Sequence, residues 1–255
     1  MSGTSSRVIA VLEALAGPEA DGLSAQDVVE RSGLPASTGY RIISELQEMG
    51  LVHRTATRRI MANFSFQRRL HCPGLDPELL ADACAALSDR LTSAAEIVML
   101  SGHNMLWHIV QQHPDQAIRL RAFPGFMRGA YELDSISRLA LAHRPLEAIE
   151  KSWDTGAFYT TGVDRRSLDW GEARGMITAV DPGEMQYDMM GNAKGIRRYC
   201  VAIHGPDGRM VCLLTVAEAA IPVRDEMQHV ANVRSHLMTR KSMIESAFAG
   251  SAKTG

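Results

Sequence analysis

Residues 35–50, PASTGYRIISELQEMG, have the pattern of one helix with a polar leading end and an apolar inward face. Pro35 suits a first helical turn, where its missing N–H would have no intrahelical acceptor, and Gly50 suits the position after the last turn, where φ is positive. Apolar residues recur at spacings of three and four along one side. They are Ile42, Ile43, Leu46 and Met49. The pattern predicts a helix that packs on a core with one face and leaves the opposite face free.

The free face of this helix begins with two hydroxyls, a phenol and a guanidinium, which belong to Ser37, Thr38, Tyr40 and Arg41. Such groups at a helix N-terminus can donate hydrogen bonds to phosphate oxygens and base edges, and the helix dipole favours an anion there. Hydroxyls at helix starts are also common caps, so an ordinary capped surface helix is the alternative. We interpret residues 35–50 as a DNA-recognition helix.

The residues before this helix complete a helix-turn-helix pattern. Apolar spacing predicts a first helix over about residues 6–16. Ser24, with Asp27 three residues later, forms a near capping box for a second helix, AQDVVERS, which stops at Gly33. In a helix-turn-helix the shorter helix braces the recognition helix across the major groove of DNA.

Residues 51–66, LVHRTATRRIMANFSF, mix strand-forming residues with arginine and have the length of a two-stranded hairpin. We predict a wing that contacts the DNA backbone or minor groove. Its cations would be Arg54, Arg58 and Arg59. With Arg68 and Arg69, and no acidic residue, residues 51–70 form a local basic patch in a chain of net charge −2. Arginine is suited to bidentate contacts with phosphate and guanine.

With these elements assembled, the N-terminal third resembles the winged helix-turn-helix of the IclR family of bacterial transcriptional regulators. The resemblance rests on RVIAVLEALA at 7–16 and on GLSAQDVVERSGLPASTGYRIISELQEMGLVHR at 22–54, in unbroken register. The exit of the wing departs from the family, because MANFSFQRRL stands where a glycine-containing Y-x-L-G segment is usual.

The rest of the chain has the pattern of an α+β domain. A break at HCPGLDP, residues 71–77, precedes a helix, ELLADACAALSDRL, whose apolar stripe could pack on its own domain or on a second subunit. From Glu96 the pattern changes to short strands with a turn at 101–104 and a third strand at about 117–122. A helix over 164–180, a short strand at 185–187, a hairpin of 198–204 with 210–217, and a C-terminal helix opened by Pro222 complete the pattern.

We therefore predict three segments. Residues 1–70 form a winged helix-turn-helix, residues 71–92 a linker helix, and residues 93–250 an effector-binding domain. This last segment is similar, more weakly, to the IclR effector domain, a GAF-like fold with one small-molecule pocket. Asp188 in EMQYD keeps the family's aspartate, and Arg198 in GIRRYCVAI stands where cysteine is common. The resemblance implies an effector site formed by Ser135, Ile136, Asp188, Arg198, Thr215 and Ala217.

An arginine on an inner strand is costly to bury unless it meets a carboxylate. The partner of Arg198 could be Asp188, Glu132 or a ligand. If it is a ligand, the effector is an organic acid or a related carbonyl compound, oriented by the hydroxyls of Thr215 and Ser135. If it is Asp188, the pocket can admit a neutral ligand. Our expectation is the charged ligand.

Other kinds of chemistry lack a supporting pattern. His103, His108 and His113 are five residues apart and no H-E-x-x-H occurs, so no metal site is expected. The sequence contains no nucleophile elbow and no phosphate-binding glycine loop. We therefore expect neither catalysis nor a cofactor. The four cysteines show no C-x-x-C spacing, and the N-terminus does not resemble a signal peptide. Both observations favour a protein of the reducing cytoplasm. The longest apolar runs fall short of the roughly 18 residues of a membrane span.

The sequence thus predicts a ligand-responsive, DNA-binding transcriptional regulator and not an enzyme. Its partners would be double-stranded operator DNA and a small organic effector. Because one winged helix reads only one half-site, we also expect a homodimer or homotetramer. Two alternatives remain: an enzyme with a passenger winged-helix domain, and a ligand-free DNA-binding protein whose C-terminal core is filled.

Overall fold

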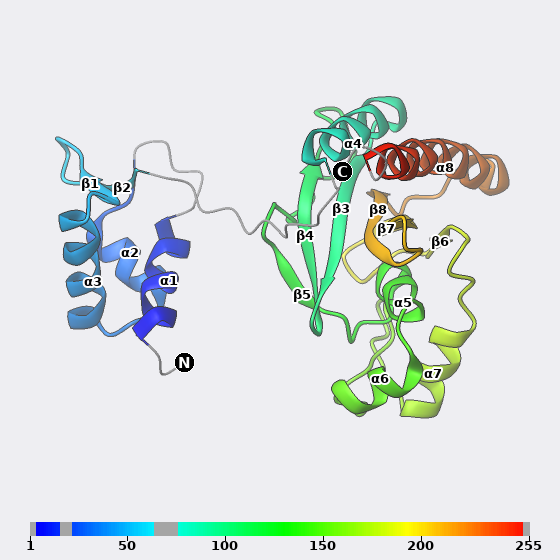
Figure 1. Ribbon diagram of the computed structural model, residues 1–255, viewed down its shortest axis with the longest axis horizontal. Coiled ribbons are helices and arrows are strands. Elements are labelled where there is room, and N and C mark those ends of the chain that lie inside the picture. Colours follow the sequence, from blue (N-terminus) through cyan, green and yellow to red (C-terminus); the bar gives the residue numbers. More distant parts are fainter. Residues whose placement is uncertain (1–3, 16–21, 64–75, 252–255) are drawn as a thin grey trace. The chain divides into compact units, whose positions relative to one another are not determined.

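The structure is a computed structural model that describes residues 4–15, 22–63 and 76–251. The chain divides into two compact units, Met1–Gln67 and Arg68–Gly255, which are described separately (Figure 1). The predicted helix end at 17–18, the last part of the wing, Arg68 and Arg69, and the break at 71–75 lie outside the described residues. Within the described ranges, no helix has both the length and the apolar character needed to cross a membrane.

The first unit is a helix-turn-helix followed by a hairpin. It consists of α1 (Thr4–Leu15), α2 (Ala25–Ser32), α3 (Ala36–Glu48), β1 (Val52–Arg54) and β2 (Ile60–Ala62). The strands β1 and β2 pair antiparallel, which confirms the predicted wing hairpin. The capping box at the start of α2 is also confirmed, because Ser24 Oγ accepts from Asp27 N and Asp27 Oδ2 accepts from Ser24 N, both at 3.1 Å.

Glycines fix the geometry of this unit. Gly33 and Gly50 have φ of 65° and 70° and turn the chain after α2 and α3, as predicted. Gly39 lets α3 approach α2 closely, since a Cβ at this position would lie 2.7 Å from Val29 Cγ2. Met49, predicted to face inward, is instead 69% exposed, because α3 extends beyond the core before Gly50 turns the chain into β1. The other three residues of the stripe, Ile42, Ile43 and Leu46, are buried.

The second unit is built on one antiparallel sheet of six strands in the order β5-β4-β3-β8-β7-β6. The strands are β3 (Ala94–Ser101), β4 (Asn104–Gln111), β5 (Met127–Gly129), β6 (Gln186–Tyr187), β7 (Ile196–His204) and β8 (Met210–Ala219). The helices are α4 (Pro77–Leu91), α5 (Ser135–Ala142), α6 (Leu146–Ser152), α7 (Trp170–Thr178) and α8 (Glu226–Ser251). The predicted α+β class is confirmed.

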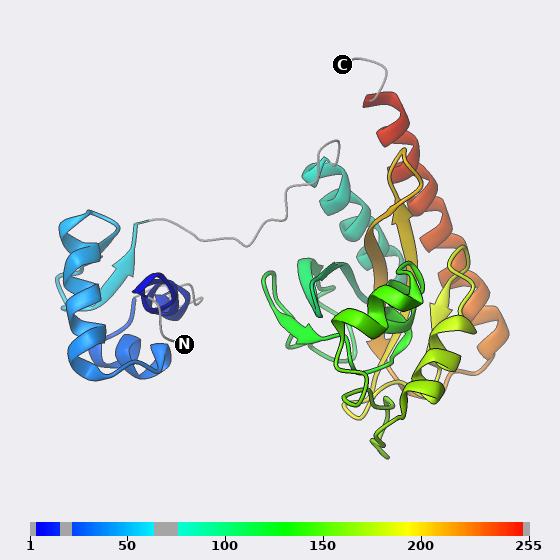
Figure 2. The same ribbon diagram turned by 60° about the horizontal axis from the view of Figure 1, so that its bottom comes forward.

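Helices cover both faces of this sheet (Figures 1 and 2). α4 and α8 pack on the face that carries Ile97, Val201 and Leu214. α5 packs on the opposite face, which carries Val98 and Leu213. Period-two alternation along each strand produces these two apolar layers. The stripe of α4 thus packs within its own unit, a question that the sequence left open.

Three predicted elements are displaced. Residues 117–122 form no strand, because the side chain of Gln112 bonds both backbone groups of Leu120 and takes the place of a strand partner. The third strand is β5 instead. α7 begins only at Trp170, where Asp169 and Glu172 form a capping box, and α8 begins at Glu226, after Pro222. α6 was not predicted.

Candidate DNA-binding surface and effector site

The start of α3 presents its polar residues on the surface of the first unit. Ser37, Tyr40 and Arg41 are exposed, while Thr38 is half-buried. Arg41 pairs with Glu45 one helical turn later, and both side chains remain about half exposed. An exposed pair of this kind contributes little to stability, so the guanidinium can exchange its partner at small cost.

The wing arginines have different local roles. Arg54 Nε donates to Gln47 Oε1 on α3 at 3.3 Å, and Arg59 Nη1 donates to the carbonyl of Gly22 at 2.9 Å. These two side chains therefore join the wing to α3 and to the segment before α2. Arg58 is exposed at the turn and adopts a left-handed φ of 61°, which is unusual for a residue other than glycine. Its guanidinium has no partner among the described residues, so of these three wing arginines Arg58 is the most available to a phosphate.

The second unit brings the predicted effector residues together around the start of α5. Ser135 N donates to Asp188 Oδ2 at 2.5 Å, and Ser135 Oγ donates to the carbonyl of Arg198 at 3.3 Å. Ile136, the second residue of α5, is fully buried, and Thr215 and Ala217 lie on β8 next to β7. These contacts join segments far apart in the sequence.

The partner of Arg198 is Glu96 on β3, which the sequence analysis did not consider. Arg198 Nε and Nη2 lie 3.0 and 3.4 Å from the two carboxylate oxygens of Glu96, and Thr215 Oγ1 donates to Glu96 Oε2 at 3.0 Å. Glu96 is 0% exposed. A lone carboxylate in the apolar run EIVML was the sequence signal for this pair.

The other two proposed partners of Arg198 are occupied elsewhere. Asp188 Oδ1 accepts from Arg138 Nη2 at 2.8 Å, and Glu132 Oε2 accepts from Arg128 Nη1 at 2.7 Å. Arg128 also pairs with Asp134. Asp188 and Glu132, two of the three partners that the sequence left open for Arg198, are therefore not its partners.

One aromatic ring lies close to two of these guanidiniums. The centre of the Trp107 ring is 5.6 Å from the Cζ of Arg128 and 5.7 Å from the Cζ of Arg198. Trp107 is buried, and within the described ranges its Nε1 finds no hydrogen-bond acceptor. The cluster around this ring thus combines cation–π contacts with one unsatisfied donor.

The charges of this cluster are already paired. Its three guanidiniums belong to Arg128, Arg138 and Arg198, and its four carboxylates to Glu96, Glu132, Asp134 and Asp188. An organic acid would find no unpaired guanidinium here and would have to displace a carboxylate. The paired charges favour a neutral ligand over the anion that we expected.

Asp134 provides a pH prediction. Burial raises the pKa of this carboxyl, but the Arg128 guanidinium and hydrogen bonds from Arg128 and Ser137 lower it more, so its pKa lies below the ordinary value of 3.8. The ionised group therefore stabilises the fold at neutral pH, and this contribution is lost as the pH falls through the lowered pKa. The test measures the free energy of unfolding with urea at a series of pH values. Between about pH 5 and pH 2, this free energy should fall less steeply for Asp134→Asn than for the wild type. Asp164→Asn, at an exposed carboxyl, is the control and should keep the wild-type slope.

The described residues offer little support for metal or thiol chemistry. They include no group of three His, Cys, Asp or Glu side chains that could hold a metal ion. Burial raises the pKa of the Cys84 and Cys200 thiols, which makes both of them poor nucleophiles.

Comparison with known families matches residues 5–56 to the IclR helix-turn-helix domain. No curated protein matches the sequence significantly. Among solved structures, an IclR homolog from Microbacterium hydrocarbonoxydans complexed with 4-hydroxybenzoate is 16% identical, with a TM-score of 0.72 over 97% of this chain and 100% of that chain. IclR of Thermotoga maritima is 14% identical, with a TM-score of 0.65 over 96% and 98%. The repressor BlcR of Agobacterium tumefaciens is 13% identical, with a TM-score of 0.54 over 96% and 97%. Both units thus share the fold of IclR structures.

Proposed function

We infer that this chain, which carries an IclR helix-turn-helix domain at residues 5–56 and the IclR fold along its length, is a ligand-responsive transcriptional regulator. The observation that carries the proposal is the family match, because the exposed polar start of α3 lies inside it. As a DNA-binding regulator the protein would act in the cytoplasm. It senses its effector and does not convert it.

In the proposed complex, α3 enters the major groove and the wing follows the sugar–phosphate backbone. Ser37, Thr38, Tyr40 and Arg41 would contact base edges and adjacent phosphates. Arg54, Arg58 and Arg59 would contact phosphates from the wing. One unit reads one half-site, so we propose a homodimer or homotetramer on a partly palindromic operator.

Arg58→Ala tests the wing contact. Loss of one phosphate contact should weaken binding similarly on all DNA sequences and reduce the salt slope of log K by about one. Salt titrations of operator and non-operator fragments provide the measurement. Arg209→Ala, which removes an exposed arginine from the second unit, is the control. An unchanged slope in Arg58→Ala would remove Arg58 from the interface.

The second unit is proposed to bind a small aromatic or carbonyl effector at its GAF-like core. The presence of 4-hydroxybenzoate in the Microbacterium homolog supports an aromatic compound. Ser135, Ile136, Asp188, Arg198, Thr215 and Ala217 are the proposed contacts. The Arg198–Glu96 pair restricts which effectors can bind at Arg198. An acidic effector could do so only if its carboxylate replaced that of Glu96.

Selection of random DNA fragments by the purified chain tests this function directly. A regulator should enrich a related set of sites and bind one of them differently when an aromatic or carbonyl compound is added. Each compound is analysed for conversion at the same time, because turnover would favour the enzyme alternative. Failure to enrich any sequence would contradict the DNA-binding role, and an operator affinity unaffected by every compound would favour the ligand-free alternative.

A further inference from the structure

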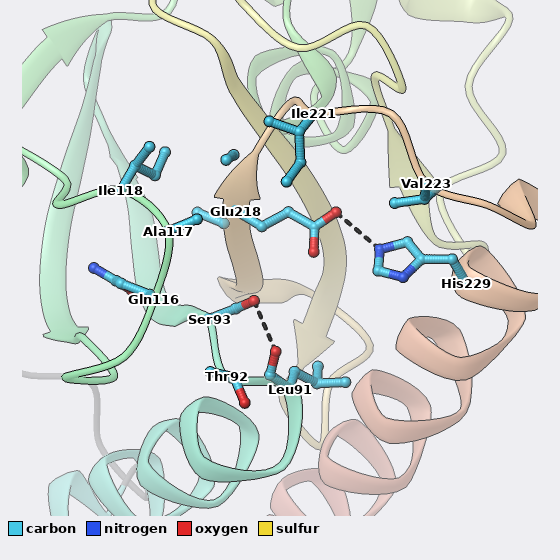
Figure 3. A pocket seen from close by; sticks show the side chains of 12 residues that line it. Leu91, Thr92, Ser93, Gln116, Ala117, Ile118, Glu218, Ile221, Val223 and His229 are labelled. Atoms are coloured by element: carbon cyan, nitrogen blue, oxygen red, sulfur yellow. Dashed lines mark hydrogen bonds and ion pairs between the residues drawn. The ribbon is translucent and has the colours of Figure 1, made fainter.

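A cavity of about 230 Å³ lies beside the end of β8 in the second unit (Figure 3). β3 begins at Ala94, opposite Ala217, so Glu218 and Ala219 pair only with β7. Among residues 4–15, 22–63 and 76–251, the backbone edge of these two residues therefore has no second strand partner. The end of α4, residues 116–118 and the start of α8 surround the gap beside that edge.

Most of the cavity wall is apolar. Its aliphatic side chains are Leu91, Ala117, Ile118, Ala217, Ala219, Ile221 and Val223. Ile221 is 58% exposed at the rim, whereas Ala217 is buried. For comparison, an apolar protein cavity of about 150 Å³ can hold benzene. The space is therefore large enough for one ring with a short substituent.

The wall contains one carboxylate, that of Glu218. Glu218 extends across the space toward His229 (Figure 3). Its Oε1 accepts from His229, Tyr199 and Arg197 at 2.8, 3.2 and 3.3 Å, while its Oε2 has no hydrogen-bond partner among the described residues. One acceptor atom, Glu218 Oε2, thus remains available to a ligand.

Charge limits the kind of ligand. The Glu218 carboxylate is paired with the Arg197 guanidinium, so neither an anion nor a cation would find an unpaired opposite charge among the described lining residues to offset its desolvation. A hydrogen bond to an ionised acceptor is stronger than one to a neutral acceptor, so a ligand that supplies one donor to Glu218 Oε2 gains from the contact.

We propose that this cavity binds a neutral small molecule with a compact apolar body and one hydroxyl or amide donor. The site is separate from the Glu96–Arg198 cluster, although Ala217 borders both. The proposal concerns binding alone and does not depend on the proposed regulatory function.

The test uses the full chain and four compounds that share one benzene ring. They are benzyl alcohol, ethylbenzene, benzylamine and benzoate, and calorimetry or ligand-observed NMR measures their affinities. Benzyl alcohol should bind about tenfold more tightly than ethylbenzene, which lacks the donor, and more tightly than either charged compound. Equal affinity for ethylbenzene would refute the donor contact, and tighter binding of benzylamine or benzoate would refute the neutral class.

Two variants locate the binding. Val223→Phe narrows the cavity at a partly exposed loop position and should lower the affinity for benzyl alcohol at least tenfold. Its control is Val163→Phe, at an exposed position outside the lining, which should leave that affinity unchanged. Glu218→Gln keeps the shape of the side chain and should lower the affinity for benzyl alcohol several-fold. Glu150→Gln, at an exposed position, is its control. Circular dichroism confirms folding. No binding of benzyl alcohol by the wild type, or undiminished binding by Val223→Phe, would overturn the proposal.

Discussion

A Glu96→Ala variant is expected to unfold with a free energy about 3–5 kcal/mol lower than that of the wild type. The substitution leaves the buried Arg198 guanidinium without its carboxylate and the Thr215 hydroxyl without its acceptor. Urea unfolding followed by tryptophan fluorescence provides the measurement. All three tryptophans, Trp107, Trp153 and Trp170, lie in the second unit, so the signal reports on that unit alone.

Two comparisons distinguish a lost ion pair from general damage to the core. Arg234→Ala breaks the exposed pair with Glu184 and should cost less than about 1 kcal/mol. The double variant Glu96→Met, Arg198→Met removes both charges and should recover most of the loss, because no buried charge remains unpaired. Added acetate should partly restore Glu96→Ala by supplying a carboxylate to Arg198. A double variant no more stable than Glu96→Ala would contradict this account.

Arg41→Ala is expected to lower affinity for a selected operator by about ten- to a hundredfold, with a smaller loss on unrelated DNA. A bidentate arginine–base contact provides about 1–3 kcal/mol of discrimination, which corresponds to this range. Fluorescence anisotropy with operator and scrambled duplexes measures both affinities, and circular dichroism confirms that the variant is folded.

Glu45→Ala is the matched control for Arg41→Ala. It breaks the same surface ion pair but leaves the guanidinium in place and removes a nearby negative charge. Operator affinity should therefore stay the same or rise. If both variants lose affinity equally, Arg41 acts by holding the helix surface and does not read DNA.

Local sequence signals were sufficient for the first unit and for the longest hairpin of the second. The Ser24–Asp27 box and the glycines after α2 and α3 act within a few residues of the positions they fix, so their consequences appear in the sequence. The hairpin of β7 and β8 follows from a tight turn at 205–208 between two apolar runs. Secondary-structure propensity and turn chemistry therefore predict these elements without knowledge of any long-range contact.

The predicted effector residues illustrate the limit of such signals. Their positions on α5, β7 and β8 and just after β6 came from family resemblance, and the structure joins Ser135 to Asp188 and Arg198 and pairs Arg198 with Ala217 across β7 and β8. Their hydrogen-bond partners did not follow from the same pattern. Residues 117–122 show the same limit, because one glutamine side chain, that of Gln112, replaces the strand pairing that the pattern predicted.

The sequence by itself determined the helix-turn-helix, the wing hairpin and the α+β class, and it identified Arg198 as a residue in need of a charged partner. Only the tertiary structure selected Glu96 as that partner, 102 residues earlier in the chain. β8 lies between β3 and β7 in the sheet, so the contact depends on strand order and on the register of two strand pairings. Burial makes such a pairing obligatory, but only the assembled sheet determines which carboxylate is within reach.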